Sequence, residues 1–172
     1  MSTPAEILTA LTGAETGLDQ ARTQVSGARD HADKVFAQAR AMGLSGVANS
    51  MARVITCLDD ALNAFAAAIT SVRDSRGPVS QISPGLTPAE VKTRLTSSIG
   101  SIDAAITSIS AAFDELDETE PVIRQALDGG DPAPLLAFIG NANTTATEGR
   151  NQARTAKTKA QELMPQTSTL GN

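Results

Sequence analysis

The feature that most restricts the fold of this chain is a run of small and apolar residues spaced alternately four and three positions apart. In the first segment the run comprises Ile7, Leu11, Ala14, Leu18, Ala21, Val25, Ala28, Ala32, Val35, Ala39 and Met42. Three further runs with helical spacing follow at 47–72, 91–116 and 135–163. Because an α-helix has 3.6 residues per turn, this spacing places the members of a run on one helix face. The sequence therefore predicts an all-α protein with four long helices.

Two of the predicted helices begin with nearly the same residues. Residues 3–12 read TPAEILTALT and residues 87–96 read TPAEVKTRLT, so seven of ten letters match at an offset of 84. The shared Thr, Pro and Glu supply a hydroxyl cap, a proline where no amide hydrogen is needed, and the partner of a capping box. Capping explains only part of the match, so we expect an internal duplication. Convergence is the alternative, because heptads align automatically at any multiple of seven.

Glycine and proline clusters divide the chain into two hairpins. Residues 42–46 (MGLSG) predict a tight turn after the first helix, and residues 127–134 (LDGGDPAP) end the third. The break at 77–86, GPVSQISPGL, contains two prolines and two glycines and predicts the linker between the hairpins. We expect helical hairpins at 1–76 and 87–164, packed together as one elongated antiparallel four-helix bundle.

Two isolated prolines add expectations about helix continuity. Pro121 should kink or split the third helix, because proline lacks the amide hydrogen and its ring crowds the preceding turn. Pro165 should end the fourth helix for the same reason, which leaves residues 165–172 as a flexible tail.

The net charge and the residue types present exclude several classes of function. A net charge of -5 and an isoelectric point near 4.8 disfavour nucleic acid, which needs a clustered basic face. The single Cys57 excludes an internal disulfide framework, and the single His31 excludes the paired Glu-x-x-His motifs of di-iron bundles. No glycine-rich phosphate loop occurs. We therefore expect no catalytic residues, no cofactor and no bound metal.

The two unusual side chains receive structural interpretations. His31 lies among charged residues, so we expect a solvated position at the edge of the helix, and one histidine in such a place makes a Ser/His/Asp triad improbable. Cys57 precedes the heptad residue Leu58, and an unpaired cysteine there is most often a small apolar filler. A redox or intermolecular disulfide role is the alternative for Cys57.

Two groups of charged residues are candidate docking sites. The acidic patch consists of Asp114, Glu115, Asp117, Glu118 and Glu120, and the basic stripe consists of Arg150, Arg154 and Lys157. The acidic patch is a candidate surface for a basic partner, with a solvated helix end and loose calcium binding as the other interpretations. The basic stripe complements the dipole of the last helix and is otherwise typical of a solvated face.

A helix, a tight glycine turn and a second helix within about 75 residues, in an acidic chain, resemble the Trp-X-Gly helical-hairpin proteins of type VII secretion systems. MGLSG occupies the place of the Trp-X-Gly turn in the first hairpin. The chain has neither tryptophan nor tyrosine, and therefore no copy of the Tyr-x-x-x-Asp/Glu export signal of that family. The resemblance implies a secreted helical hairpin or its partner.

We expect a non-enzymatic module for protein–protein interaction or assembly, which pairs its heptad faces with itself or with another helical protein. A secretion-associated hairpin is one alternative, and an amphipathic binder of lipid surfaces is another. The polar faces are rich in Ser and Thr and lack dense Lys and Arg, so we expect no membrane partner. Without a basic start and a continuous apolar run at the N-terminus, we expect a cytoplasmic protein, or one exported without a cleaved signal peptide.

Overall fold

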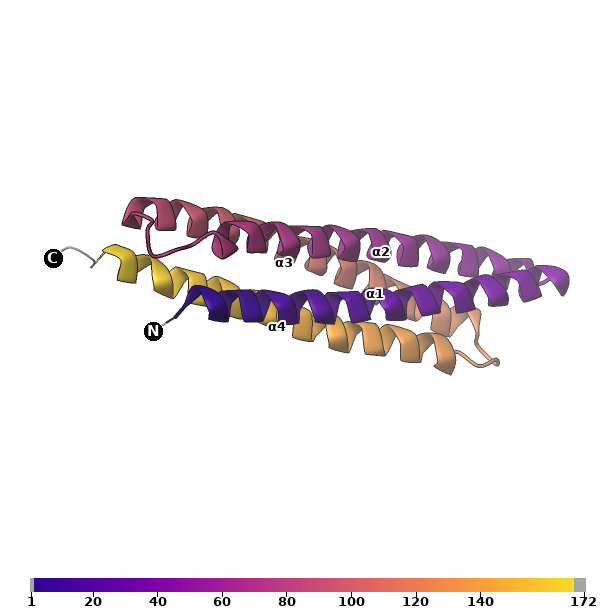
Figure 1. The fold of residues 1–172 in the computed structure, drawn as a ribbon. Helices are drawn as coiled ribbons and strands as arrows, with labels where there is room; N and C mark the ends of the chain where they lie inside the picture. Colours follow the sequence, from indigo (N-terminus) through magenta and orange to yellow (C-terminus); the bar gives the residue numbers. More distant parts are fainter. Residues whose placement is uncertain (1, 169–172) are drawn as a thin grey trace.

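The computed structural model describes residues 2–168, and within them it contains four helices. They are α1 (Pro4–Ala41), α2 (Ser45–Ser80), α3 (Pro88–Ala126) and α4 (Ala133–Ser168). Each helix runs antiparallel to the one before it, so that the start of α1 and the end of α4 lie at the same end of an elongated rod (Figure 1). The predicted all-α antiparallel bundle is confirmed.

The helices form a ring of four neighbours. α1 packs against α2 and α4, and α3 packs against the same two helices. The contacts of α2 with α3 and of α1 with α4 are the most extensive, and both join the first hairpin to the second. The two hairpins therefore lie against each other along their length and share one core.

That core is built from the heptad runs. Its largest fully buried side chains are Phe65, Ile7, Leu11, Leu18, Met51, Leu58, Leu95, Ile102, Ile109, Leu116, Ile123 and Leu135. Alanines fill much of the remainder, and in α4 they occupy the buried positions from Ala142 to Ala160 together with Gly149. Such small side chains allow neighbouring backbones to come close together. The heptad faces are thus buried inside the chain itself.

The repeated helix start folds in the same way twice. The Glu6 amide donates to Thr3 Oγ1 at 3.3 Å, while the Thr3 amide donates to Glu6 Oε2 at 2.9 Å. Thr87 and Glu90 form the same reciprocal pair at 3.3 Å and 2.8 Å. Both capping boxes are complete, which is consistent with the predicted duplication.

Helices α1 and α4 approach each other closely where glycines face the neighbouring backbone. A Cβ atom at Gly17 would lie 2.9 Å from both the amide nitrogen of Gly149 and the carbonyl oxygen of Thr145. A Cβ at Gly149 would lie 3.1 Å from the carbonyl oxygen of Ala14. These two glycines therefore let the backbones meet directly.

Two predicted helix ends are wrong by about one turn. We expected residues 77–86 to break the helix, but α2 continues through Pro78 to Ser80. We expected Pro165 to end α4, but the helix continues to Ser168, and residues 169–172 of the predicted tail lie outside the described residues. In each case a buried residue follows the proline, Val79 or Thr167, and its burial holds the last turn in place.

Pro121 does not split α3, which runs as one helix from Pro88 to Ala126. Ile123, two residues beyond the proline, is fully buried and belongs to the core. Burial of such a side chain contributes about 2 kcal/mol, comparable to the cost of a proline within a helix, so packing can maintain the final turns.

Candidate functional site

The acidic patch divides into three parts in the structure. Asp114, Asp117 and Glu118 are exposed on α3, and Glu115 is half-buried beside α2. Glu120 accepts a 2.7 Å ion pair from Arg124 one turn further along the helix. Three of the five carboxylates are therefore exposed, and the other two are partly covered or paired within the chain.

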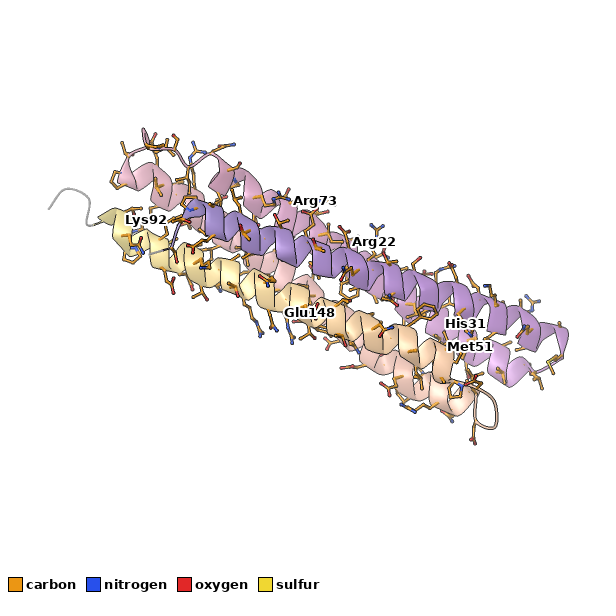
Figure 2. All side chains as sticks on the ribbon, turned by 60° about the horizontal axis from the view of Figure 1, so that its bottom comes forward. Arg22, His31, Met51, Arg73, Lys92 and Glu148 are labelled. Carbon is orange, nitrogen blue, oxygen red and sulfur yellow. The ribbon has the colours of Figure 1, made fainter. Side chains whose placement is uncertain are left out.

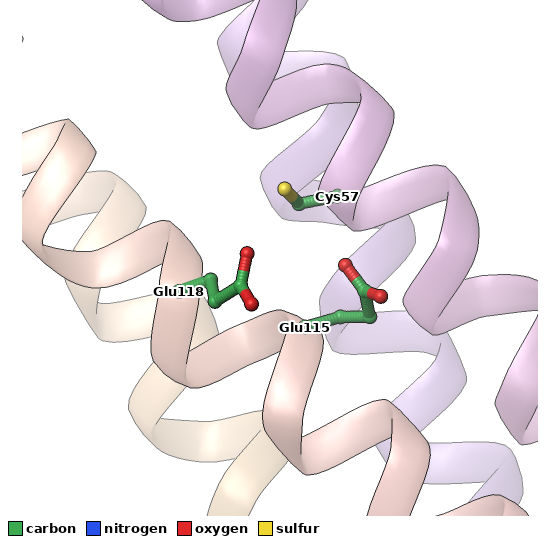
Figure 3. Close-up of side chains that lie close together, drawn as sticks. All are labelled: Cys57, Glu115 and Glu118. Carbon is green, nitrogen blue, oxygen red and sulfur yellow. The ribbon is translucent and has the colours of Figure 1, made fainter.

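Figure 3 shows that part of the acidic patch meets the single cysteine. Cys57 projects from α2 toward Glu115 and Glu118 of α3, and the Sγ atom and carboxylate oxygens all lie within 4.8 Å of one another. Burial raises the pKa of the Cys57 thiol, and the negative charges of Glu115 and Glu118 raise it further, against a smaller opposing effect of Arg53. The thiol is thus kept protonated and is a poor nucleophile.

A thiolate and two carboxylates are ligands that Zn²⁺ accepts. The thiol would first have to lose its proton, which its raised pKa opposes until a cation arrives. Sequence spacing alone could not join residues so far apart in the chain. The available signal was heptad register, because Cys57 and Glu115 each directly precede a core residue, Leu58 and Leu116.

Two of the three residues of the basic stripe on α4 contact side chains of α3. The guanidinium carbon of Arg150 lies 4.7 Å from the centroid of the Phe113 ring, a cation–π contact. Lys157 donates to Asp103 Oδ1 at 2.7 Å. Arg154 is exposed on α4. Arg150 and Lys157 are therefore engaged within the bundle.

A groove of about 1090 Å³ runs along the surface between α1 and α2. It is lined by Asp19, Arg22, Thr23, Ser26, Gly27, Asp30, Asp59, Leu62, Asn63 and Ala66. Arg22 projects from the outer side of α1 in Figure 2, which also places His31 further along the same helix. His31, for which a solvated position was expected, is half-buried.

The turn between α1 and α2 carries exposed apolar side chains. Met42 is 72% exposed and Leu44 is 46% exposed, and they are the exposed large hydrophobic residues of the described chain. Gly43 between them has φ +74, which allows the tight reversal. A second groove of about 490 Å³ next to the turn includes Phe36, Arg40 and Ala48. We call Met42, Gly43 and Leu44, together with this second groove, the hairpin tip.

By length and composition alone, α2 could cross a membrane. A third of its most apolar 18-residue stretch is buried inside the bundle. The core helix of a bundle has the same length and composition.

Comparison with protein families finds one match, to a family of unknown function (DUF6244), over residues 86–172. This match covers just over half of the chain and includes all of α3 and α4. Comparisons with curated proteins and with solved structures find no match. The chain therefore belongs to the DUF6244 family.

Proposed function

We propose that this protein is a non-enzymatic module for protein–protein interaction or assembly. The observation that carries the proposal is the pair of exposed side chains, Met42 and Leu44, at the hairpin tip. Large apolar side chains exposed close together in the chain are typical of contact surfaces, because burying them against a partner is favourable.

The bundle limits which surfaces can serve this function. The heptad faces that we expected to pair with a partner are occupied by the chain's own helices. A partner must therefore use the outer surfaces and the ends of the rod. In the second groove, the guanidinium carbon of Arg40 lies 5.7 Å from the centroid of the Phe36 ring, so an aromatic and a cationic group line the groove next to the turn.

Site-specific photo-cross-linking tests the proposal. A photoreactive residue replaces Met42 in one variant and Thr96, which is exposed near the start of α3, in the control. We expect intermolecular adducts from position 42 and none from position 96, in cells of the native host and with the purified protein. Light scattering after size exclusion then distinguishes self-association from binding to another protein. A monomer that gives no adduct at position 42 would rule out the tip as a contact surface.

A second candidate is a secretion-associated helical hairpin or its partner. The observation that favours it is the hairpin geometry itself, since the 38-residue α1 and the 36-residue α2 are joined by a three-residue turn at Gly43. This candidate predicts the intact protein in the culture medium of the native host, without a cytosolic marker enzyme. Retention of all the protein inside the cells would exclude it.

A further inference from the structure

We propose that the groove between α1 and α2 receives a cationic amphipathic helix of a partner protein. The inference depends on the proposed function, because it names the chemical class of partner for an interaction module. It concerns a surface separate from the hairpin tip, so each can be tested without the other.

The shape of the groove suits a helix. On the α1 side the small residues Thr23 and Ser26 lie in the middle of its wall, between the longer side chains at either end. On the α2 side Leu62 and Ala66 are half-buried and supply an apolar floor. A groove between two antiparallel helices can accept a third helix, which places its apolar side chains on such a floor.

The charge of the groove specifies a cationic partner. Its lining contains three aspartates, Asp19, Asp30 and Asp59, and a single arginine. Asp59 accepts a 2.7 Å ion pair from Arg29. Arg73 and Arg29 interact electrostatically with Asp19 and Asp30. Both aspartates are nevertheless exposed and form no ion pair within 4 Å in the part of the chain that the structure describes, so a partner's cation can reach them.

The spacing of the two unpaired aspartates fits one side of a helix. Asp19 and Asp30 are eleven residues apart on α1, which corresponds to three helical turns and about 16 Å. Both side chains therefore lie along the same line of the helix, with Thr23 and Ser26 between them. A partner helix with lysines or arginines three turns apart would meet both carboxylates and still place an apolar side chain over Leu62.

The exposed acidic residues of α3 carry the same charge as the aspartates of the groove but do not line a groove between α1 and α2. Asp114 and Asp117 are exposed, and neither lines the α1–α2 groove. They provide a matched control, because replacing two aspartates by lysines changes the net charge equally in both places. If the partner responds only to net charge, both variants should weaken its binding equally. If it binds in the groove, only the α1 variant should do so.

The test uses the full chain and a fluorescent synthetic helix of leucine and lysine, whose binding is measured by anisotropy at physiological salt. The double variant Asp19→Lys/Asp30→Lys should weaken binding about tenfold, since two rim charges together contribute roughly 1 to 2 kcal/mol. The control Asp114→Lys/Asp117→Lys should stay within about twofold of the unaltered protein. Circular dichroism confirms that both variants remain helical.

Three results would overturn the inference. Equal weakening by both variants would mean that the peptide responds to net charge only, and greater weakening by the α3 variant would assign binding to the acidic patch. Absence of binding to the unaltered protein would show that the groove does not accept cationic amphipathic helices. Cross-linking at position 42 would still decide the proposed function, because the hairpin tip shares no residue with this groove.

Discussion

At the scale of single residues, glycines within the helices have different roles that the sequence alone does not reveal. Replacing Gly17 by Ala adds a methyl group 2.9 Å from backbone atoms of α4, which cannot rotate away. Overpacking of this kind costs about 1 to 3 kcal/mol and should exceed the gain of roughly 1 kcal/mol in helix propensity. We therefore expect Gly17→Ala to lower the free energy of unfolding in urea by up to about 2 kcal/mol.

Gly100→Ala is the matched control for this substitution. Gly100 lies on the exposed face of α3, and a Cβ there would have no atom within 4 Å. The same change should therefore raise the free energy of unfolding by up to about 1 kcal/mol. If Gly17→Ala raised stability as Gly100→Ala is expected to do, the close approach of α1 and α4 would be wrong.

Glu15 gives a residue-scale prediction that depends on pH. Its carboxylate accepts ion pairs from Arg73 at 2.6 Å and Arg76 at 2.8 Å. The hydrogen bond from Arg73 is the main cause that lowers the pKa of Glu15 below its ordinary value of 4.5, while partial burial opposes it. Because this pKa is lower in the folded chain, the stabilisation is complete above the unfolded value and is lost as the pH falls through the folded value.

Glu15→Gln should therefore cost about 1 kcal/mol at neutral pH, a modest amount because both arginines are exposed to solvent. The difference between the variant and the unaltered protein should shrink as the pH falls below about 4.5. Glu120→Gln, which breaks an exposed pair within α3, should cost less than about 0.5 kcal/mol. Chemical unfolding across this pH range measures all three proteins, and a pH-independent difference would contradict the role of Glu15.

At the scale of helices, the heptad spacing was sufficient to predict four helices and most of the core. The prolines were misjudged because the cost of one proline is local, whereas the burial that opposes it comes from other helices. Helix α3 passes through Pro121 without a break. Because the nitrogen of Pro121 carries no hydrogen, one backbone hydrogen bond of the helix is missing there. The spacing of apolar residues within one segment does not predict how other helices will pack against it.

Pro121→Ala should consequently stabilise α3. The exposed proline has no amide hydrogen to donate, and alanine restores one hydrogen bond and removes the clash with the preceding turn. We expect a gain of about 1 to 3 kcal/mol, measured by thermal unfolding and by hydrogen exchange of residues 117–126. Pro165→Ala, close to the end of α4, should give a smaller gain. A loss of stability at position 121 would show that the proline is required for the local geometry.

At the scale of the whole molecule, the sequence predicted two packed hairpins but not which helices would contact most extensively. The strongest packing lies between the hairpins, at α2 with α3 and α1 with α4, and it depends on close approaches such as Gly17 to Gly149. The juxtaposition of Cys57 with Glu115 and Glu118 also depends on this pairing of helices. Heptads define a face for each helix but not its neighbour, so the site could be assembled only once the pairing was known.

This shared core predicts that the two hairpins unfold together. Leu11 in α1 and Leu95 in α3 occupy corresponding positions at the offset of 84, and both are fully buried. Leu11→Ala and Leu95→Ala should each lower the free energy of unfolding by about 2 to 5 kcal/mol. Because α1 and α3 both contact α2 and α4, each variant should retain one cooperative transition and lose hydrogen-exchange protection in all four helices. If either variant unfolded only its own hairpin while the other kept its protection, the hairpins would be separate folding units that merely lie side by side.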